Sequence, residues 1–214
     1  MTTAWLAGGS GLVGGVLLRE LLEDDHFTQV VSVGRRGMAF QHPKLTQAVA
    51  DFSSPSGFES LPPPDAGFGC LGTTIRKVGS AEAFRKVDHD AVLAFAQAAR
   101  DKGARVFVHV TALGADPHSR VFYNSVKGEI ERDVALLGFP SVYALRPSIL
   151  DGARQESRPA EYLGLIVARG LGPLLGRYRP TPVVAVAKRM IASAKAAAPG
   201  AHVIEAGEIV KGRG

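Results

Sequence analysis

The amino-acid sequence predicts an α/β fold, a doubly wound parallel sheet covered by helices on both faces. Short apolar runs recur along the chain, and the longer segments between them repeat apolar residues at helical spacing. A glycine-rich turn joins the first run to the first helical segment. Strands that alternate with crossover helices pair in parallel, and such a sheet is buried on both faces. The length of 214 residues fits one domain of this kind.

Seven apolar runs are predicted to form the strands of this sheet. These are Ala4–Ala7, Gln29–Val33, Leu45–Ala50, Gly67–Leu71, Arg105–Val110, Ser141–Leu145 and His202–Ile204. The predicted helices are Val13–Leu21, Phe84–Lys102, Val126–Leu137, Glu161–Arg169 and Pro182–Ala198. The proline-rich segment Phe52–Gly69 is expected to be a loop or a degraded crossover helix. We expect a single domain over residues 1–214, in which residues 151–214 form a short substrate-side extension.

The composition excludes several classes of protein. A chain with 46% hydrophobic and 21% charged residues is not disordered as a whole. The single cysteine excludes a disulfide framework, and the six histidines show no ligand spacing, so we expect no metal site. The net charge of +5 comes from scattered rather than clustered Lys and Arg residues. The sequence therefore gives little support to the hypothesis that the protein binds nucleic acid.

The segment Met1–Leu18 carries no charged residue and superficially suggests a signal peptide or a membrane anchor. It lacks a basic leading region, glycines interrupt it, and Arg19 and Glu20 end it short of a membrane span. We therefore expect a soluble cytoplasmic protein with no membrane or nucleic-acid partner, present as a monomer or a homodimer.

A G-x-x-G-x-x-G array lies between the first predicted strand and the first predicted helix. In that position a pyrophosphate meets free backbone N–H groups and the positive end of the helix. The first glycine allows the turn, the second allows close approach of the phosphate, and the third lets helix and strand pack. The alternative is an ordinary glycine-rich turn. We interpret the array as a nucleotide-binding loop with Gly8, Ser10, Gly11, Leu12, Val13 and Gly14 as its candidate residues.

The second predicted strand is followed by Arg35 and Arg36. An NAD-preferring site would carry a carboxylate at about this place to bind the ribose 2′-hydroxyl, and none is present. A guanidinium suits a 2′-phosphate through paired charge-assisted hydrogen bonds. The alternative is a solvated basic turn. The arginines favour NADP(H) as the cofactor, with NAD(H) possible.

A Y-x-x-x-K pentad places Tyr123 and Lys127 one turn apart on a predicted helix. Both flank the apolar stripe that contains Val126 and Ile130, so they can point across the strand ends. A neighbouring ammonium favours the deprotonated phenol, which can then exchange a proton with a carbonyl or an alcohol near neutral pH. The alternative is an ordinary surface pair on a helix.

Thr111 follows the fifth predicted strand, at the edge where ligands collect in open α/β sheets. Its hydroxyl could donate to a substrate oxygen while Tyr123 handles the proton. The alternative is a threonine that simply ends a strand, which is a common placement.

The glycine array, the pentad and Thr111 together resemble the short-chain dehydrogenase/reductase superfamily. Four further strings resemble its atypical Tat-interacting-protein-like branch, an NAD(P)-binding, epimerase-like group with a Rossmann-type domain. These strings are Cys70–Thr74, Gly79–Asp88, Leu113–Asp116 and Leu145–Ser148. The similarity spans roughly residues 6–159.

The resemblance implies further cofactor contacts. Asp51 and Phe52 would flank the adenine, and Leu71, Gly72 and Thr73 would line the ribose side. Lys127 would also bind the nicotinamide ribose, while Pro147 and Ser148 would border the nicotinamide. Relatives often carry two serines where this chain has Thr111 and Ala112, so the resemblance leaves the polarising hydroxyl open. The C-terminal part is also shorter than the substrate domain of sugar epimerases.

Three other polar positions receive structural interpretations. Cys70 and His109 fall in predicted strands. Cys70 is expected to be a buried small apolar residue, and His109 a hydrogen-bonded core or edge residue rather than a catalyst. The acidic stretch Asp88–Asp90 is expected to lie on a helix face near the cofactor.

The sequence thus predicts an NADP(H)-dependent oxidoreductase acting on a small carbonyl or alcohol, with Tyr123, Lys127 and Thr111 as catalytic residues. The alternative is an NADP(H)-binding redox-sensing or regulatory protein with little or no turnover. The two differ in whether the cofactor exchanges hydride with a carbonyl compound.

Overall fold

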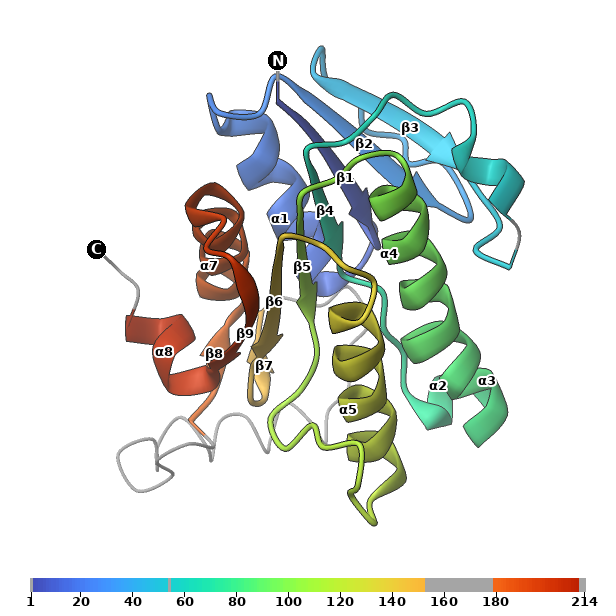
Figure 1. Cartoon of the computed structure of the whole chain (residues 1–214), viewed down its shortest axis with the longest axis vertical. Coiled ribbons are helices and arrows are strands. Elements are labelled where there is room, and N and C mark those ends of the chain that lie inside the picture. Colours follow the sequence, from blue (N-terminus) through green and yellow to red (C-terminus); the bar gives the residue numbers. More distant parts are fainter. Residues whose placement is uncertain (1, 54, 153–178, 212–214) are drawn as a thin grey trace.

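The computed structural model describes residues 2–53, 55–152 and 179–211. Its main sheet has seven parallel strands in the order β3-β2-β1-β4-β5-β6-β9 (Figure 1). The strands are β1 Thr3–Ala7, β2 Gln29–Gly34, β3 Leu45–Val49, β4 Ala66–Gly69, β5 Val106–Val110, β6 Ser141–Arg146 and β9 Gly200–Glu205. The predicted doubly wound parallel sheet is confirmed.

The strand order reverses between β1 and β4. From β1 the chain moves outward to β2 and β3, and it then returns to the other side of β1 as β4, β5, β6 and β9. All strands are parallel, so their carboxyl ends lie along one edge of the sheet. In open α/β sheets the ligand-binding crevice lies at that edge, beside the point where the order reverses.

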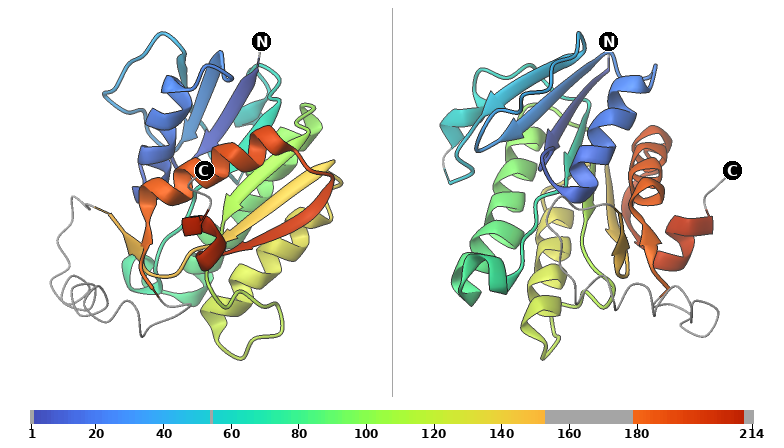
Figure 2. Two further views of the ribbon diagram at one scale, coloured as in Figure 1. Left: turned by 90° about the vertical axis from the view of Figure 1, so that its left-hand side faces the viewer. Right: turned by 180° about the vertical axis from the view of Figure 1, so that it is seen from behind.

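Helices cover both faces of the sheet (Figure 2). On one face, α1 Leu12–Glu23 packs against α7 Val183–Ala196. On the other face lie α4 Ala91–Asp101 and α5 Phe122–Ala135. Two separate cores result, and the strands contribute alternate residues to them.

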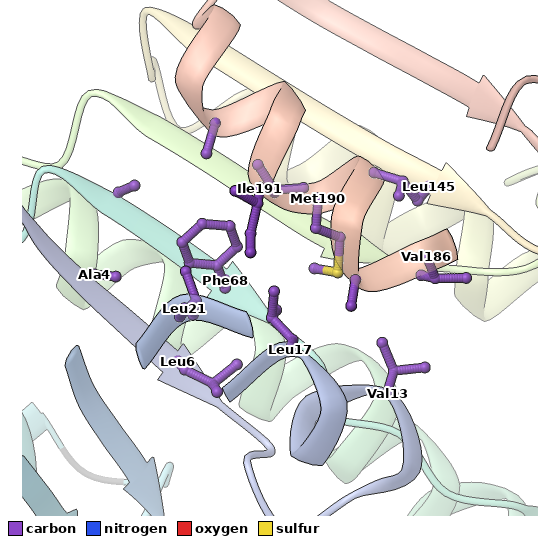
Figure 3. Close-up of a cluster of buried hydrophobic side chains, with 14 of the residues drawn as sticks. Ala4, Leu6, Val13, Leu17, Leu21, Phe68, Leu145, Val186, Met190 and Ile191 are labelled. Carbon is purple, nitrogen blue, oxygen red and sulfur yellow. The ribbon is translucent and has the colours of Figure 1, made fainter. Parts of the chain in front are cut away.

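The alternation is clear in β1, where Leu6 enters the core under α1 and α7, while Trp5 enters the core under α4 and α5. In the first core, Leu17 of α1 and Met190 of α7 meet over Phe68 of β4 (Figure 3). Side chains that are buried on both faces of every central strand explain why these strands read as continuous apolar runs.

The segment before α4 is irregular and contributes to the site described below. After β4, a short helix α2 Ile75–Val78 ends at Gly79, and α3 Ala81–Arg85 leads into a π-helical turn, η2 Lys86–Asp90. The φ angle of +86° at Gly79 is the left-handed conformation that favours glycine. The π turn runs directly into α4, and π turns inside helices are frequent at functional sites.

Most sequence-predicted elements are present with shifted ends. The fourth strand stops at Gly69, two residues earlier than predicted, so Cys70 and Leu71 follow it. The crossover between β3 and β4 contains one 3-10 turn, η1 Pro55–Phe58. The helix predicted over 161–169 lies outside the described residues. Four short elements were not predicted: α2, the strands β7 Leu150–Asp151 and β8 Thr181–Pro182, which pair with each other, and the helix α8 Ala206–Lys211.

Candidate active site

The glycine array forms a tight turn between β1 and α1. Gly8 has a φ of +88°, and a Cβ added there would lie 2.5 Å from the carbonyl oxygen of Cys70. A Cβ on Gly14 would lie 2.0 Å from the carbonyl oxygen of Gly8. The Gly11 N–H donates to that same Gly8 oxygen at 2.8 Å. No side chain fits at Gly8 or Gly14, because the turn packs tightly against the segment after β4 and against itself.

Helix α1 begins directly after this turn, with Gly11 as its N-cap. No side chain in the described part of the chain caps it, so the backbone N–H groups of its first turn have no such partner. These amides and the helix dipole attract an anion. The loop therefore fits a phosphate group, with Ser10 and Gly11 exposed at its surface and Leu12 and Val13 opening the helix.

The two arginines lie at the same edge of the sheet as the glycine loop. Val33 of β2 pairs with Ala7 of β1, so Arg35 and Arg36 follow β2 beside the turn that Gly8 begins. Both arginine side chains are exposed. They are therefore free to bind a phosphate that extends from the loop towards β2.

Of the two residues after β3 that the resemblance places at the adenine, Phe52 is largely buried. The Phe52 ring is 8% exposed and packs in the core against Phe58 and Phe95. The Asp51 carboxylate is exposed and accepts hydrogen bonds from the N–H and hydroxyl of Ser53, which lower the pKa of Asp51. The predicted adenine contact of Phe52 is therefore limited to the small surface that its ring leaves uncovered.

Two further segments frame this edge. Leu71, Gly72 and Thr73 follow β4, and Pro147 and Ser148 follow β6. The Leu113 N–H donates to the Pro147 carbonyl at 2.9 Å, and the Ser148 hydroxyl bonds Arg179 and Thr181. The segment after β6 is therefore fixed by contacts with the loop after β5 and with β8.

The pentad residues occupy the first two turns of α5 in different environments. The Tyr123 side chain is 37% exposed, and its ring lies against the ring of Phe84, with the centroids 5.6 Å apart. Lys127 is buried, with only 4% exposed, and its Nζ lies 2.7 Å from Oδ1 of Asp88. The Tyr123 side chain is therefore accessible to a ligand from solvent, whereas the Lys127 ammonium is buried beside Asp88.

Asp88 is a site residue whose contact with Lys127 the sequence did not reveal. It comes from the π turn η2, is 1% exposed, and accepts the Thr73 N–H at 2.8 Å through Oδ2. Burial raises the pKa of the Asp88 carboxyl, against the opposing effects of Lys127 and the Thr73 N–H. The side chain connects three parts of the site: η2, the segment after β4, and α5.

His109 lies in β5 beneath this cluster, 1% exposed, with its ring against that of Phe107. His109 is a core residue, as one of the two expected placements had it, but neither ring nitrogen has a hydrogen-bond partner among the described residues, so the expected hydrogen bonding is wrong. Burial lowers the pKa of His109 to about 3, and the charge of Lys127 adds to the effect. The imidazole is therefore neutral near pH 7.

Thr111 is buried, and its hydroxyl lies 2.5 Å from Oε1 of Glu131. Glu131 is two turns beyond Tyr123 on α5 and forms a bidentate pair with Arg146 of β6. The hydrogen bonds that Arg146 donates to Glu131 raise the pKa of the Arg146 guanidinium, which also contacts Glu205 of β9. The Thr111 hydroxyl thus belongs to a network that joins β5, α5, β6 and β9.

Other features add no reactive group here. Burial raises the pKa of the Cys70 thiol to about 12, so the thiol stays protonated. In the parts of the chain that the structure describes, no cluster of three or more His, Cys, Asp or Glu side chains could hold a metal ion. Within the same residues, every helix is too short or too polar to cross a membrane.

The chain has well-matched curated relatives. Protein HTATIP2 from Rattus norvegicus is 37% identical over 193 residues, which cover 88% of this chain and 79% of the relative. The mitochondrial protein fmp52 from Aspergillus niger is 38% identical over 184 residues, covering 83% and 77% of the two chains. This chain belongs to the Tat-interacting-protein-like HTATIP2/FMP52 family. No family model matches it.

Solved structures share the fold at low sequence identity. A short-chain dehydrogenase from Leptospira borgpetersenii with bound NAD+ has a TM-score of 0.74 at 14% identity, covering 97% of this chain and 92% of the other. One from Burkholderia cenocepacia in complex with NADP has a TM-score of 0.68 at 15% identity, covering 99% and 92%. The HTATIP2/FMP52 member described here therefore has the Rossmann-type fold of NAD(P)-binding dehydrogenases and epimerases.

The expected cytoplasmic location is wrong as stated. The fungal FMP52 relatives, including those from Aspergillus niger and Eremothecium gossypii, are named as mitochondrial proteins. The expectation rested on one cysteine and on the uncharged N-terminal segment. Low cysteine usage indicates reducing conditions, which do not identify a single compartment.

Proposed function

We propose that this chain is an NADP(H)-dependent oxidoreductase that interconverts a small carbonyl compound and its alcohol. The observation that supports the proposal is the position of a partly exposed Tyr123 phenol one helical turn before a buried Lys127 ammonium on α5. The same end of the sheet carries the glycine loop, which is followed directly by the first turn of α1. Phenol, ammonium and phosphate-binding backbone are the parts that acid–base-assisted hydride transfer requires.

The cofactor-binding groups divide along the sheet edge. The first-turn amides of α1 and the turn from Gly8 to Gly14 would hold the pyrophosphate. Arg35 and Arg36 would bind a 2′-phosphate, which is why we favour NADP(H), although related folds bind either nucleotide. Lys127 would donate to the nicotinamide ribose.

The chain's own chemical contribution is the proton. When bound, the cofactor supplies or accepts the hydride at the carbonyl carbon. The Tyr123 hydroxyl would donate its proton to the carbonyl oxygen during reduction and take it back during oxidation. The positive charge of Lys127 stabilises the phenolate that this donation leaves behind.

Thr111 remains a predicted donor to the substrate oxygen, but its hydroxyl already contacts another side chain. A threonine hydroxyl has one proton to donate, and here that hydroxyl lies within hydrogen-bonding distance of Glu131. Donation to a substrate would require this bond to break. The next residue, Ala112, has no hydroxyl to offer. We therefore assign the proton transfer to Tyr123 and retain Thr111 as a secondary candidate.

The test is hydride transfer from NADPH deuterated at the nicotinamide C4 to a panel of aldehydes and ketones, followed by mass spectrometry of the alcohols. Tyr123→Phe should lower turnover by a factor of about 100 or more, since it removes the proton donor but leaves the cofactor contacts. Tyr143→Phe is the matched control. The Tyr143 hydroxyl accepts the Ala198 N–H in the core, away from the site. Equal turnover of the wild type and Tyr123→Phe would contradict the assignment.

A second candidate function is an NADP(H)-binding regulatory protein with little turnover. Two observations favour it: the Thr111 hydroxyl contacts Glu131, and the Asp88 carboxylate offsets the charge of Lys127. This candidate predicts that NADPH binds but that deuterium passes to no carbonyl compound. It also predicts that a protein partner binds with different affinities in the presence of NADP+ and NADPH.

A further inference from the structure

The Asp88 carboxylate uses its two oxygens for two different partners. Oδ2 accepts the backbone N–H of Thr73 at 2.8 Å, which ties the side chain to the segment after β4. Oδ1 lies 2.7 Å from Nζ of Lys127 on α5. Both charged side chains are nearly excluded from water, with 1% of Asp88 and 4% of Lys127 exposed. Such a pair is held only where its geometry compensates for the loss of hydration.

The pair lies beside the backbone that the resemblance places at the cofactor ribose. A Cβ built on Gly72 would lie 3.5 Å from Oδ1 of Asp88 and 4.0 Å from Nζ of Lys127. A lysine ammonium has three N–H donors, and the ion pair with Asp88 engages at most one of them. The remaining donors leave Lys127 able to bind a ligand hydroxyl while it stays attached to Asp88.

The other titratable groups around the pair do not replace Asp88 as a counter-charge. His109 on β5 is neutral, because burial lowers the pKa of its ring to about 3. Glu131, one turn beyond Lys127 on α5, is occupied by Arg146 and Thr111. Tyr123 lies one helical turn before Lys127 on α5.

We propose that Asp88 is the positioning residue of the acid–base site: it holds the Lys127 ammonium, one helical turn from Tyr123 on α5, and thereby sets the pH range in which Tyr123 works. The proposal rests on the proposed function and extends it to a residue of the π turn. A lone buried ammonium would favour the phenolate strongly, whereas the carboxylate 2.7 Å away offsets much of that effect. Asp88 thereby moves proton transfer towards higher pH.

An amide cannot substitute for the carboxylate at this place. Asparagine has one acceptor oxygen, so it can serve either the Thr73 N–H or the Lys127 ammonium, and its NH2 group would repel the other donor. Asp88→Asn should therefore remove the counter-charge and release one of the two contacts, with almost no change in side-chain volume.

The first experiment measures alcohol oxidation against pH for the wild type, Asp88→Asn and the control Glu82→Gln. Glu82 forms an exposed pair with Lys86 just before Asp88, so its variant also removes a lysine-bound carboxylate. In Asp88→Asn the midpoint of the rise in rate should move to lower pH by about one unit, because the ammonium acts without its counter-charge. Glu82→Gln should keep the wild-type midpoint. An unchanged midpoint in Asp88→Asn would overturn the proposal.

The second experiment needs no turnover and separates this proposal from the proposed function. Acetic anhydride labels lysines in the cofactor-free protein, and mass spectrometry gives the rate at each site. Lys127 should react far more slowly than Lys86 in the wild type and several-fold faster in Asp88→Asn. A wild-type Lys127 that reacts as fast as Lys86, or a rate unchanged in Asp88→Asn, would contradict the pair.

The experiments distinguish a failure of the proposed function from a failure of the Asp88 proposal. If Tyr123→Phe keeps full turnover, the proposed function fails, while the labelling result still reports on Asp88. If Asp88→Asn does not fold, Asp88→Glu takes its place, because it keeps the charge at a longer reach. That variant should fold and keep Lys127 slow to react, and fast labelling in it would overturn the proposal.

Discussion

The two halves of the candidate site use different kinds of chemical group. The nucleotide half, at β1, β2 and α1, consists of backbone amides, a turn that excludes side chains, and two exposed arginines. The acid–base half, at β4, β5, η2 and α5, consists of buried charged side chains that meet across separate elements. The nucleotide half requires glycines, because a Cβ at Gly8 or Gly14 would collide with backbone atoms. The acid–base half requires that its buried charges be paired. Substitutions should therefore damage the two halves for different reasons.

The largest effect is expected where the nucleotide half admits no side chain. Gly14→Ala places a Cβ 2.0 Å from the Gly8 carbonyl oxygen, so the turn or the helix must shift. We expect a loss of about 3 kcal/mol or more in the free energy of unfolding, measured by chemical denaturation. The neighbouring Gly15→Ala is the control, since its Cβ would lie 3.5 Å from the Gly9 oxygen. That variant should be as stable as the wild type or gain up to about 1 kcal/mol. Equal stabilities of the two variants would contradict the steric account.

The next effect tests charge pairing in the other half. Lys127→Met leaves the Asp88 carboxylate buried without its partner, which should cost about 3–5 kcal/mol. Asp88→Leu combined with Lys127→Met should recover much of that loss, because the double variant buries no charge. Urea denaturation of the two single variants and the double variant gives the coupling. Additive losses would show that the two side chains do not stabilise each other.

His109 should make the acid–base half sensitive to acid. Its folded pKa of about 3 lies below its ordinary value of 6.5, so the unfolded chain binds the proton more readily. Stability should therefore fall as the pH drops from about 6.5 towards about 3, by a few kcal/mol in total. His109→Leu should flatten this part of the stability profile, whereas His118→Gln, at an exposed histidine, should leave it unchanged. A profile as steep in His109→Leu as in the wild type would rule out this source.

The smallest effect is expected at the exposed pair near the same π turn. Lys86 and Glu82 are 2.8 Å apart, but their side chains are 67% and 78% exposed. Solvent screens such a pair, so Glu82→Gln should produce no measurable change in thermal denaturation midpoint. A loss comparable to that of Lys127→Met would show that burial does not separate the two ion pairs.

Local patterns explain how much the sequence could predict. The glycine array, Arg35 and Arg36 lie within one strand–helix–strand unit, so spacing along the chain located them together. The location of Tyr123 and Lys127 one turn apart on a single helix, α5, likewise followed from helical periodicity. The central strands β1, β2, β5 and β6 were found because nearly all of their residues are buried and most are apolar.

Contacts between distant elements could not be predicted in this way. Asp88 reaches Lys127 because a π turn interrupts the helix, and helical periodicity gives no sign of such a turn. The string Gly79–Asp88, which supported the family resemblance, contained the residue without indicating its partner. His109 looked like an ordinary core histidine because the absence of a hydrogen-bond partner is a three-dimensional property. The Thr111–Glu131 contact also spans two elements.

The most direct test of the account is isothermal titration of the wild type with NADPH, NADP+ and NADH, repeated on the Arg35→Ala/Arg36→Ala variant. Arg105→Ala, an exposed arginine at the opposite edge of the sheet, is the control. We predict that NADPH and NADP+ bind more tightly than NADH, that the double variant loses this preference by about tenfold or more, and that the control keeps it. A wild type that binds none of the three nucleotides would contradict the central claim that this site holds a nicotinamide cofactor.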